Sequence, residues 1–111
     1  MNEKVLKSLY DILLAIEEID TFFINRTKRF DIYCNDTLLR RGIERNLEII
    51  GEAMNRILKD EPNINIGNAK RIVGLRNQIS HGYDSVSDEN IWGVVINHLP
   101  QLKKDIQILI G

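Results

Sequence analysis

Residues 39–59 read LRRGIERNLEIIGEAMNRILK, and the spacing of the apolar side chains in this stretch decides the fold class. Apolar residues recur every three or four positions, which is the period of an amphipathic α-helix that buries one face. This face consists of Leu39, Ile43, Leu47, Ile50, Met54, Ile57 and Leu58. Asn35 or Asp36 can cap the helix by accepting a hydrogen bond from a first-turn amide, and residues 60–63 are expected to end it.

Two glycines interrupt this otherwise regular helix. Gly42 and Gly51 each cost roughly 1 kcal/mol of helix stability relative to alanine. Glycine removes the Cβ atom and lets another backbone come near. We therefore expect a neighbouring element to approach the helix closely at these two positions.

The sequence on both sides of this helix has the same period. On the N-terminal side, steps of four and three residues predict a long helix whose buried seam is Val5, Leu9, Ile12, Ile16, Ile19 and Phe23. A break is expected at residues 30–34, before the central helix. On the C-terminal side, Asn68 is expected to cap a helix that Gly82 ends. The apolar residues of that helix are Ile72, Val73, Leu75 and Ile79.

A last apolar stripe follows Ser87 or Asp88, either of which can cap its first turn. Its members are Ile91, Trp92, Val95, Ile96, Leu99, Leu102, Ile106, Leu109 and Ile110. Pro100 lies within this stripe and is expected to kink the helix or to split it in two. Because no stretch shows sustained strand alternation, the sequence predicts an all-α bundle of four or five helices.

Length and composition limit the classes of protein to consider. The 111 residues predict one domain, residues 1–111, with one core. Lys and Arg total 15 against 16 Asp and Glu, and this net charge of −1 argues against nucleic-acid binding by bulk charge while allowing a local basic site. The single cysteine, Cys34, can form neither an internal disulfide nor a CxxC metal site. Short apolar runs and an N-terminus without signal-peptide order predict a cytoplasmic protein with no membrane span.

Most polar residues fit structural roles. Glu44, Glu48 and Glu52 recur every four residues, and we interpret them as a solvated helix edge that pairs with arginines of the same helix. These expected partners are Arg40, Arg41, Arg45 and Arg56. His98 has no carboxylate or cysteine at metal-ligand spacing, so we interpret it as a surface or helix-end histidine. The sequence therefore predicts no metal site and no cofactor.

Residues 76–83, RNQISHGY, are the exception, because they combine a guanidinium, an imidazole and a phenol. No acidic residue occurs between Pro62 and Tyr83, whereas Lys70, Arg71 and Arg76 give this segment a local charge of +3. A guanidinium can grip phosphate through two hydrogen bonds, and an imidazole titrates near neutral pH. The segment therefore predicts an anion-binding site that contains an acid–base group.

Helical geometry relates these side chains to one another. Asn77 and His81 are four residues apart and share a helix face, so the amide can orient the imidazole. Arg76 and His81 are five apart, about 140° around an ideal helix, so a straight helix does not aim both at one point. Arg76 and His81 would be brought together by the length of the arginine stem, by unwinding of the helix near Gly82, or by a two-fold dimer. From the residues alone, a helix end where His81 and Tyr83 only stabilise the dipole and the cap stays an open alternative.

The same segment resembles the RNxxxHxY signature of the HEPN superfamily and, within it, of the HepT-like toxins of minimal nucleotidyltransferase toxin–antitoxin systems. The resemblance extends to residues 43–53, IERNLEIIGEA, which are similar to the family's second-helix segment, an ER pair followed by LEIIGEA. Residues 88–92, DENIW, and residues 99–100, LP, also fall where the family carries similar residues. The match covers nearly the whole chain, in order and with fitting lengths.

This resemblance implies an all-α homodimer with metal-independent endoribonuclease activity, whose active site forms where the two subunits meet. Arg76 and His81 match the catalytic arginine and histidine, and Asn77 matches the polar residue beside the arginine. Tyr83 matches the tyrosine that a partner nucleotidyltransferase, the antitoxin, modifies with AMP to silence the toxin.

Two other classes of function fit the sequence. In one, the cationic site holds a nucleotide for a partner nucleotidyltransferase, so the chain would bind ATP or AMP and leave RNA intact. In the other, the chain is a structural dimerisation bundle and is indifferent to substitution of Arg76 and His81.

Overall fold

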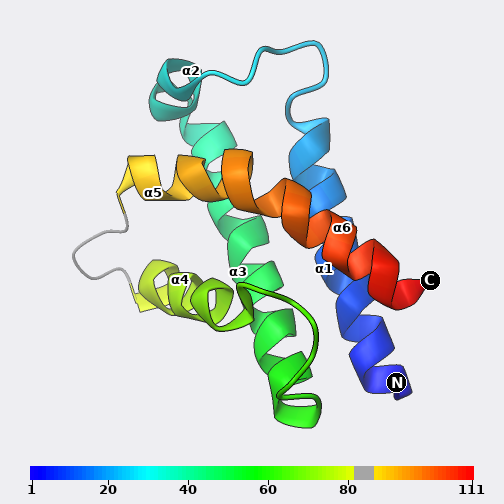
Figure 1. Cartoon of the computed structure of the whole chain (residues 1–111). Coiled ribbons are helices and arrows are strands. Elements are labelled where there is room, and N and C mark those ends of the chain that lie inside the picture. Colours follow the sequence, from blue (N-terminus) through cyan, green and yellow to red (C-terminus); the bar gives the residue numbers. More distant parts are fainter. Residues whose placement is uncertain (82–86) are drawn as a thin grey trace.

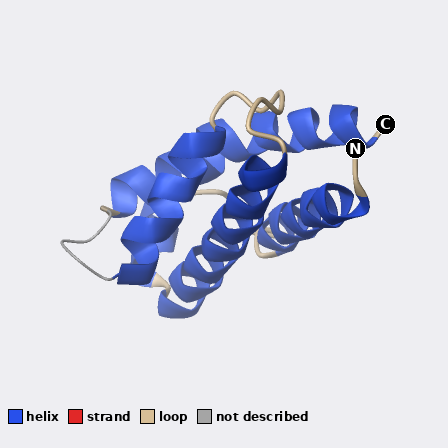
Figure 2. Ribbon diagram, turned by 90° about the horizontal axis from the view of Figure 1, so that it is seen from below, coloured by secondary structure: helices blue, strands red, loops and turns tan. Residues whose placement is uncertain are grey.

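The computed structural model of the chain describes residues 1–81 and 87–111, and every regular element in these residues is a helix (Figures 1 and 2). The elements are α1 (Glu3–Thr21), α2 (Phe30–Asn35), α3 (Thr37–Asp60), α4 (Ala69–His81), α5 (Asp88–Gly93), the π-helix η1 (Val94–His98) and α6 (Leu99–Ile110). The all-α fold class is therefore confirmed. None of the helices in the described residues is both long enough and apolar enough to span a membrane.

Side-chain caps fix where α3 and α5 begin. The Asp36 carboxylate accepts a hydrogen bond from the backbone N of Leu39 at 3.0 Å and begins α3. This bond, together with the nearby guanidinium of Arg26, holds the pKa of the Asp36 carboxyl below its usual value. Ser87 caps α5 in the same way, its hydroxyl accepting from the backbone N of Asn90 at 3.2 Å. Of the expected alternatives, Asp36 and Ser87 are the caps that the structure uses.

The expected break at residues 30–34 is wrong, because these residues form the short helix α2. Tyr33 of α2 is fully buried, and its ring lies 5.4 Å from that of Trp92 and 6.5 Å from that of Phe30, measured between centroids. Aromatic burial of this kind stabilises a single helical turn that its own short sequence pattern does not reveal. Trp92 also contacts Phe23 and packs, half-buried, against the core, on the side that its place in the apolar stripe predicts.

The predicted effect of Pro100 takes the form of a change in helix type. The chain runs from α5 through η1 into α6 as one continuous helical path (Figure 1). The backbone N of Leu99 bonds to the carbonyl of Val94, five residues earlier, as in a π-helix. Pro100 then lies in the first turn of α6, where its missing N–H removes no bond within α6.

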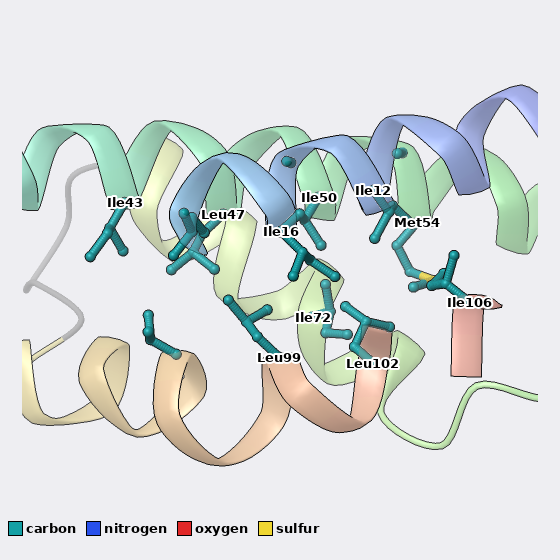
Figure 3. Packing of buried hydrophobic residues seen from close by; sticks show 14 of the residues in the cluster. Ile12, Ile16, Ile43, Leu47, Ile50, Met54, Ile72, Leu99, Leu102 and Ile106 are labelled. Atoms are coloured by element: carbon teal, nitrogen blue, oxygen red, sulfur yellow. The ribbon is translucent and has the colours of Figure 1, made fainter. Parts of the chain in front are cut away.

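The core lies between α1, α3 and α6, and α4, which packs on α3, adds Ile72 to it (Figure 3). Helix α1 packs on α3 and α6, whereas α2 packs on α3 and α5. The predicted seam of α1 is buried: Val5, Leu9, Ile12, Ile16 and Ile19. The predicted face of α3 is buried as well from Leu39 to Ile57. These faces account for the packing of the two longest helices.

The two glycines of α3 mark contacts of different kinds. A methyl group at Gly51 would overlap with Cβ of Arg76, and it would lie 2.7 Å from Cγ of Arg76 and 3.2 Å from the carbonyl oxygen of Ile72. The expected close approach of another element is therefore confirmed here, and that element is α4. At Gly42 the nearest group is the ring of Phe22, at 3.0 Å, so there a side chain rather than a backbone fills the space.

We expect Gly51→Ala to lower the free energy of unfolding by about 1–2 kcal/mol, measured by urea denaturation. Overpacking typically costs about 1–3 kcal/mol and here outweighs the roughly 1 kcal/mol that alanine gains in helix propensity. Gly74→Ala is the matched control, because a Cβ atom at Gly74 of α4 meets no other atom within 4 Å. It should stabilise the protein by up to about 1 kcal/mol. Equal stabilisation by both substitutions would contradict the close contact of α3 and α4.

Candidate active site

Arg76, the first residue of the 76–83 segment, packs closely against a neighbouring helix. It lies on the side of α4 that faces α3, where the carbonyl of Ile72 and the stem of Arg76 both lie against Gly51. The arginine side chain keeps 32% of its surface exposed. The stem is therefore packed against the neighbouring helix, while the guanidinium stays accessible to a ligand.

Two polar groups hold the Arg76 guanidinium. One terminal nitrogen, Nη1, donates a hydrogen bond to Oδ1 of Asn77 at 2.8 Å, and the other, Nη2, lies 3.8 Å from Oε1 of Glu52. The third nitrogen, Nε, is buried and has no hydrogen-bond partner among the described residues. Asn77 thus supports the arginine directly, a contact that the sequence does not reveal.

For Glu48 and Glu52, the expected pairing with arginines of the same helix is wrong. Glu52 lies beside Arg76, and Glu48 accepts a hydrogen bond from the hydroxyl of Ser80 at 3.0 Å, so both reach α4. Two of the expected arginine partners bond elsewhere: Arg40 to Asp88 of α5, and Arg56 to Asp11 and Ser8 of α1. The carboxylates therefore line the contact between α3 and α4.

A signal for this arrangement is present in the sequence. Gly51 precedes Glu52 by one residue and follows Glu48 by three, so the two glutamates flank the glycine on the helix surface. A glycine that admits a neighbouring helix places its flanking side chains next to that helix. Identifying α4 as that neighbour requires the tertiary structure.

The structure describes little of the other two functional candidates, His81 and Tyr83. Helix α4 stays helical as far as His81, so the angle of about 140° between Arg76 and His81 applies to its backbone. The side chain of His81 lies outside the described side chains, and Gly82 and Tyr83 lie outside the described residues. The predicted contact of Asn77 with His81, the predicted cap at Gly82 and the role of Tyr83 therefore stay predictions.

The positive charges of α4 lie on different parts of its surface. Lys70 and Arg71 are exposed, whereas Arg76 is partly covered by α3 and has Glu52 beside it. The local +3 of the sequence is thus spread along the helix rather than gathered at one point. Within the described part of the chain, no three potential metal ligands come together.

Comparison with known proteins identifies the family. Residues 12–109 match the HepT-like family, described as "Ribonuclease HepT-like". The chain is 34% identical to "Putative RNase MJ1380" of Methanocaldococcus jannaschii, over 98% of this chain and 100% of that protein. It is also 33% identical to "Putative RNase TTE0752" of Caldanaerobacter subterraneus, over 78% and 80% of the two chains. No solved structure gives a significant match. The resemblance of the sequence is thereby confirmed: the chain belongs to the HepT-like ribonuclease family.

Proposed function

We propose that this chain is a metal-independent endoribonuclease, and that it is the toxin of a pair whose antitoxin is a minimal nucleotidyltransferase. Membership of the HepT-like ribonuclease family over residues 12–109 supports the reaction class. The observation that carries the assignment is the placement of Arg76. Its stem packs on Gly51 and its guanidinium bonds to Asn77 beside Glu52, yet the guanidinium stays accessible, five residues before a histidine on the same helix.

The chemistry follows from what RNA itself provides. The 2′-hydroxyl next to the scissile phosphate attacks the phosphorus, so the enzyme must remove a proton from that hydroxyl and supply one to the leaving 5′-oxygen. His81 is an imidazole that can perform either transfer near neutral pH. Arg76 stabilises the negative charge that develops on the phosphate oxygens, with two parallel hydrogen bonds from its planar guanidinium.

One chain carries a single His81, whereas the reaction uses both a base and an acid. A two-fold homodimer brings a second His81 and a second Arg76 to the same place. It also removes the difficulty that Arg76 and His81 point about 140° apart on one helix, because each can work with its counterpart from the other subunit. We therefore propose that the active site is formed by two copies of α4.

The regulatory part of the proposal concerns Tyr83, as the target of AMP transfer by the partner. The other two tyrosines are poor candidates on structural grounds. Tyr33 is fully buried, and burial raises the pKa of its phenol to about 12. Tyr10 is exposed but belongs to α1, which packs on α3 and α6 rather than on α4. AMP on Tyr83 would place bulk and negative charge two residues from His81.

We expect the purified protein to cleave single-stranded RNA in EDTA, and His81→Ala to reduce the cleavage rate by about 10²–10⁴-fold, the usual contribution of general acid–base catalysis. Arg76→Lys should be strongly impaired too, since lysine keeps the charge but loses the planar pair of donors. Arg29→Lys, the same change at an exposed arginine that pairs with Asp31, is the control. Full activity of His81→Ala would refute its role, and ATP binding without RNA cleavage would favour the nucleotide-binding alternative.

The active protein should be a homodimer at micromolar concentration, because the proposed site needs two subunits. Light scattering coupled to size-exclusion chromatography measures its mass against the 12.9 kDa of one chain. A monomer mass at concentrations where RNA is cleaved would be incompatible with a composite site.

Incubation with the partner nucleotidyltransferase and ATP should add AMP to Tyr83 and abolish RNA cleavage, with the modified residue located by mass spectrometry. Tyr83→Phe should keep the fold and escape this inactivation. Tyr10→Phe serves as its control and should still be silenced. Modification of another residue, or none with an active partner, would show that Tyr83 is not the switch.

A further inference from the structure

A second face of α4 borders a cleft that is separate from the Arg76 side. Residues of α4 line one wall of this cleft, and residues of α5 and η1 line the other. Its volume is about 480 Å³, which lies within the range of roughly 300–1,000 Å³ typical of ligand pockets. Arg71 and Gln78 line it from α4, about 150° around the helix from Arg76 on average. The cleft and the arginine therefore use different sides of one helix.

The walls of the cleft carry polar side chains that are free to bind a ligand. Gln78 of α4 lines the cleft together with Asn90 and Asn97 of the other wall, and none of these amide side chains has a hydrogen-bond partner among the described residues. Ile72, Leu75 and Val94 add apolar surface to the lining. Amides offer both donors and acceptors, and an apolar surface accepts the face of a planar ring. This combination suits a nucleobase.

Two glycines keep the cleft open. Gly74 of α4 and Gly93 of α5 both line it, and a Cβ atom built at either position meets no other atom within 4 Å. At Gly51 another helix fills the space next to the glycine, but no element in the described part of the chain fills the space next to Gly74 or Gly93. This space in both walls is available to a ligand.

The two ends of the cleft differ in charge. The helices run antiparallel, so the start of α4 lies beside the end of η1, and the end of α4 lies towards the start of α5 (Figure 1). Arg71 and His98 therefore line one end, and Glu89 with Asn90 lines the other. A phosphate is favoured at the arginine end. A carboxylate at the opposite end accepts hydrogen bonds from the amino and imino groups of a base.

We propose that this cleft binds one nucleotide of single-stranded RNA, with its phosphate at Arg71 and His98 and its base towards Gln78, Asn90 and Glu89. The inference rests on the proposed ribonuclease function and adds a subsite that selects the RNA sequence. Along the axis of α4, Arg71 precedes His81 by roughly 15 Å, at 1.5 Å per residue. The subsite thus holds a nucleotide beside the scissile bond rather than the reacting phosphate.

The test measures binding without cleavage. A short fluorescent RNA oligonucleotide with 2′-O-methyl groups on every ribose lacks the nucleophile, and its dissociation constant is measured by fluorescence anisotropy at several salt concentrations. Arg71→Gln removes the proposed phosphate contact. Its control is Lys70→Gln, which removes the same charge from an exposed neighbour that does not line this cleft. Gly93→Leu fills the cleft, and Gly93→Ala, which adds only a methyl group, is its control.

We expect Gly93→Leu and Arg71→Gln to weaken RNA binding by about tenfold or more, and Arg71→Gln also to lower the slope of log K against log salt by about one. The two controls should stay near the values of the unmodified protein. Thermal melting followed by circular dichroism verifies that each variant is folded. Unchanged affinity in Gly93→Leu and Arg71→Gln, or no RNA binding by the unmodified protein, would overturn the proposal.

Two further measurements separate this proposal from others. Titration with ATP and AMP tests whether the cleft takes a free nucleotide, and ATP binding that only the cleft variants lose, without an effect on RNA, would overturn the assignment to RNA. Cleavage of the unmodified oligonucleotide is scored independently. Loss of binding in the cleft variants of a protein that cleaves no RNA would support the subsite and refute the proposed ribonuclease function. RNA cleavage by the unmodified protein, with unchanged RNA binding in the cleft variants, would support the proposed ribonuclease function and refute the subsite.

Discussion

The contact between Gly51 of α3 and the stem of Arg76 is the constraint on which the candidate site depends. A helix interior gives up roughly 1 kcal/mol to hold a glycine there. In return, α4 comes so near that Cβ and Cγ of Arg76 lie against the backbone of α3. The arginine stem has little freedom to move in this position. The guanidinium is therefore presented in one place before any ligand binds, which lowers the entropy cost of gripping a phosphate.

The same contact brings acidic groups next to the positive one. Glu52 lies 3.8 Å from the Arg76 guanidinium, and Glu48 binds Ser80 one turn later. Both partners of the Arg76–Glu52 pair are about one-third exposed, so solvent screens their attraction and the pair is weak. An RNA phosphodiester carries the same single negative charge as Glu52, but it offers two oxygens to the guanidinium, so it competes well with a single distant carboxylate oxygen. Packing on Gly51 and the hydrogen bond to Asn77 therefore position the arginine, and Glu52 lies beside it without blocking it.

The opposite faces of helix α4 have different neighbours. One face packs on α3 and fixes Arg76, whereas the other is separated from α5 and η1 by the amide-lined cleft. The missing side chain at Gly51 lets α4 pack directly on α3, whereas the missing side chains at Gly74 and Gly93 leave the cleft open. In the function we propose, the first face carries the chemistry, and the second holds the RNA chain beside it.

The sequence by itself determined the long helices, narrowed the caps of α3 and α5 to two neighbouring residues each, and identified the segment that carries Arg76, because these depend on neighbours a few residues away. The family resemblance of that segment also follows from sequence alone. Tertiary structure decided which helix faces meet. It turned Glu48 and Glu52 towards α4, ordered residues 30–35 as α2 around a buried Tyr33, and left a cleft beside Arg71. The helical period says which side chains share a face, but what that face contacts is set by packing between residues far apart in the chain.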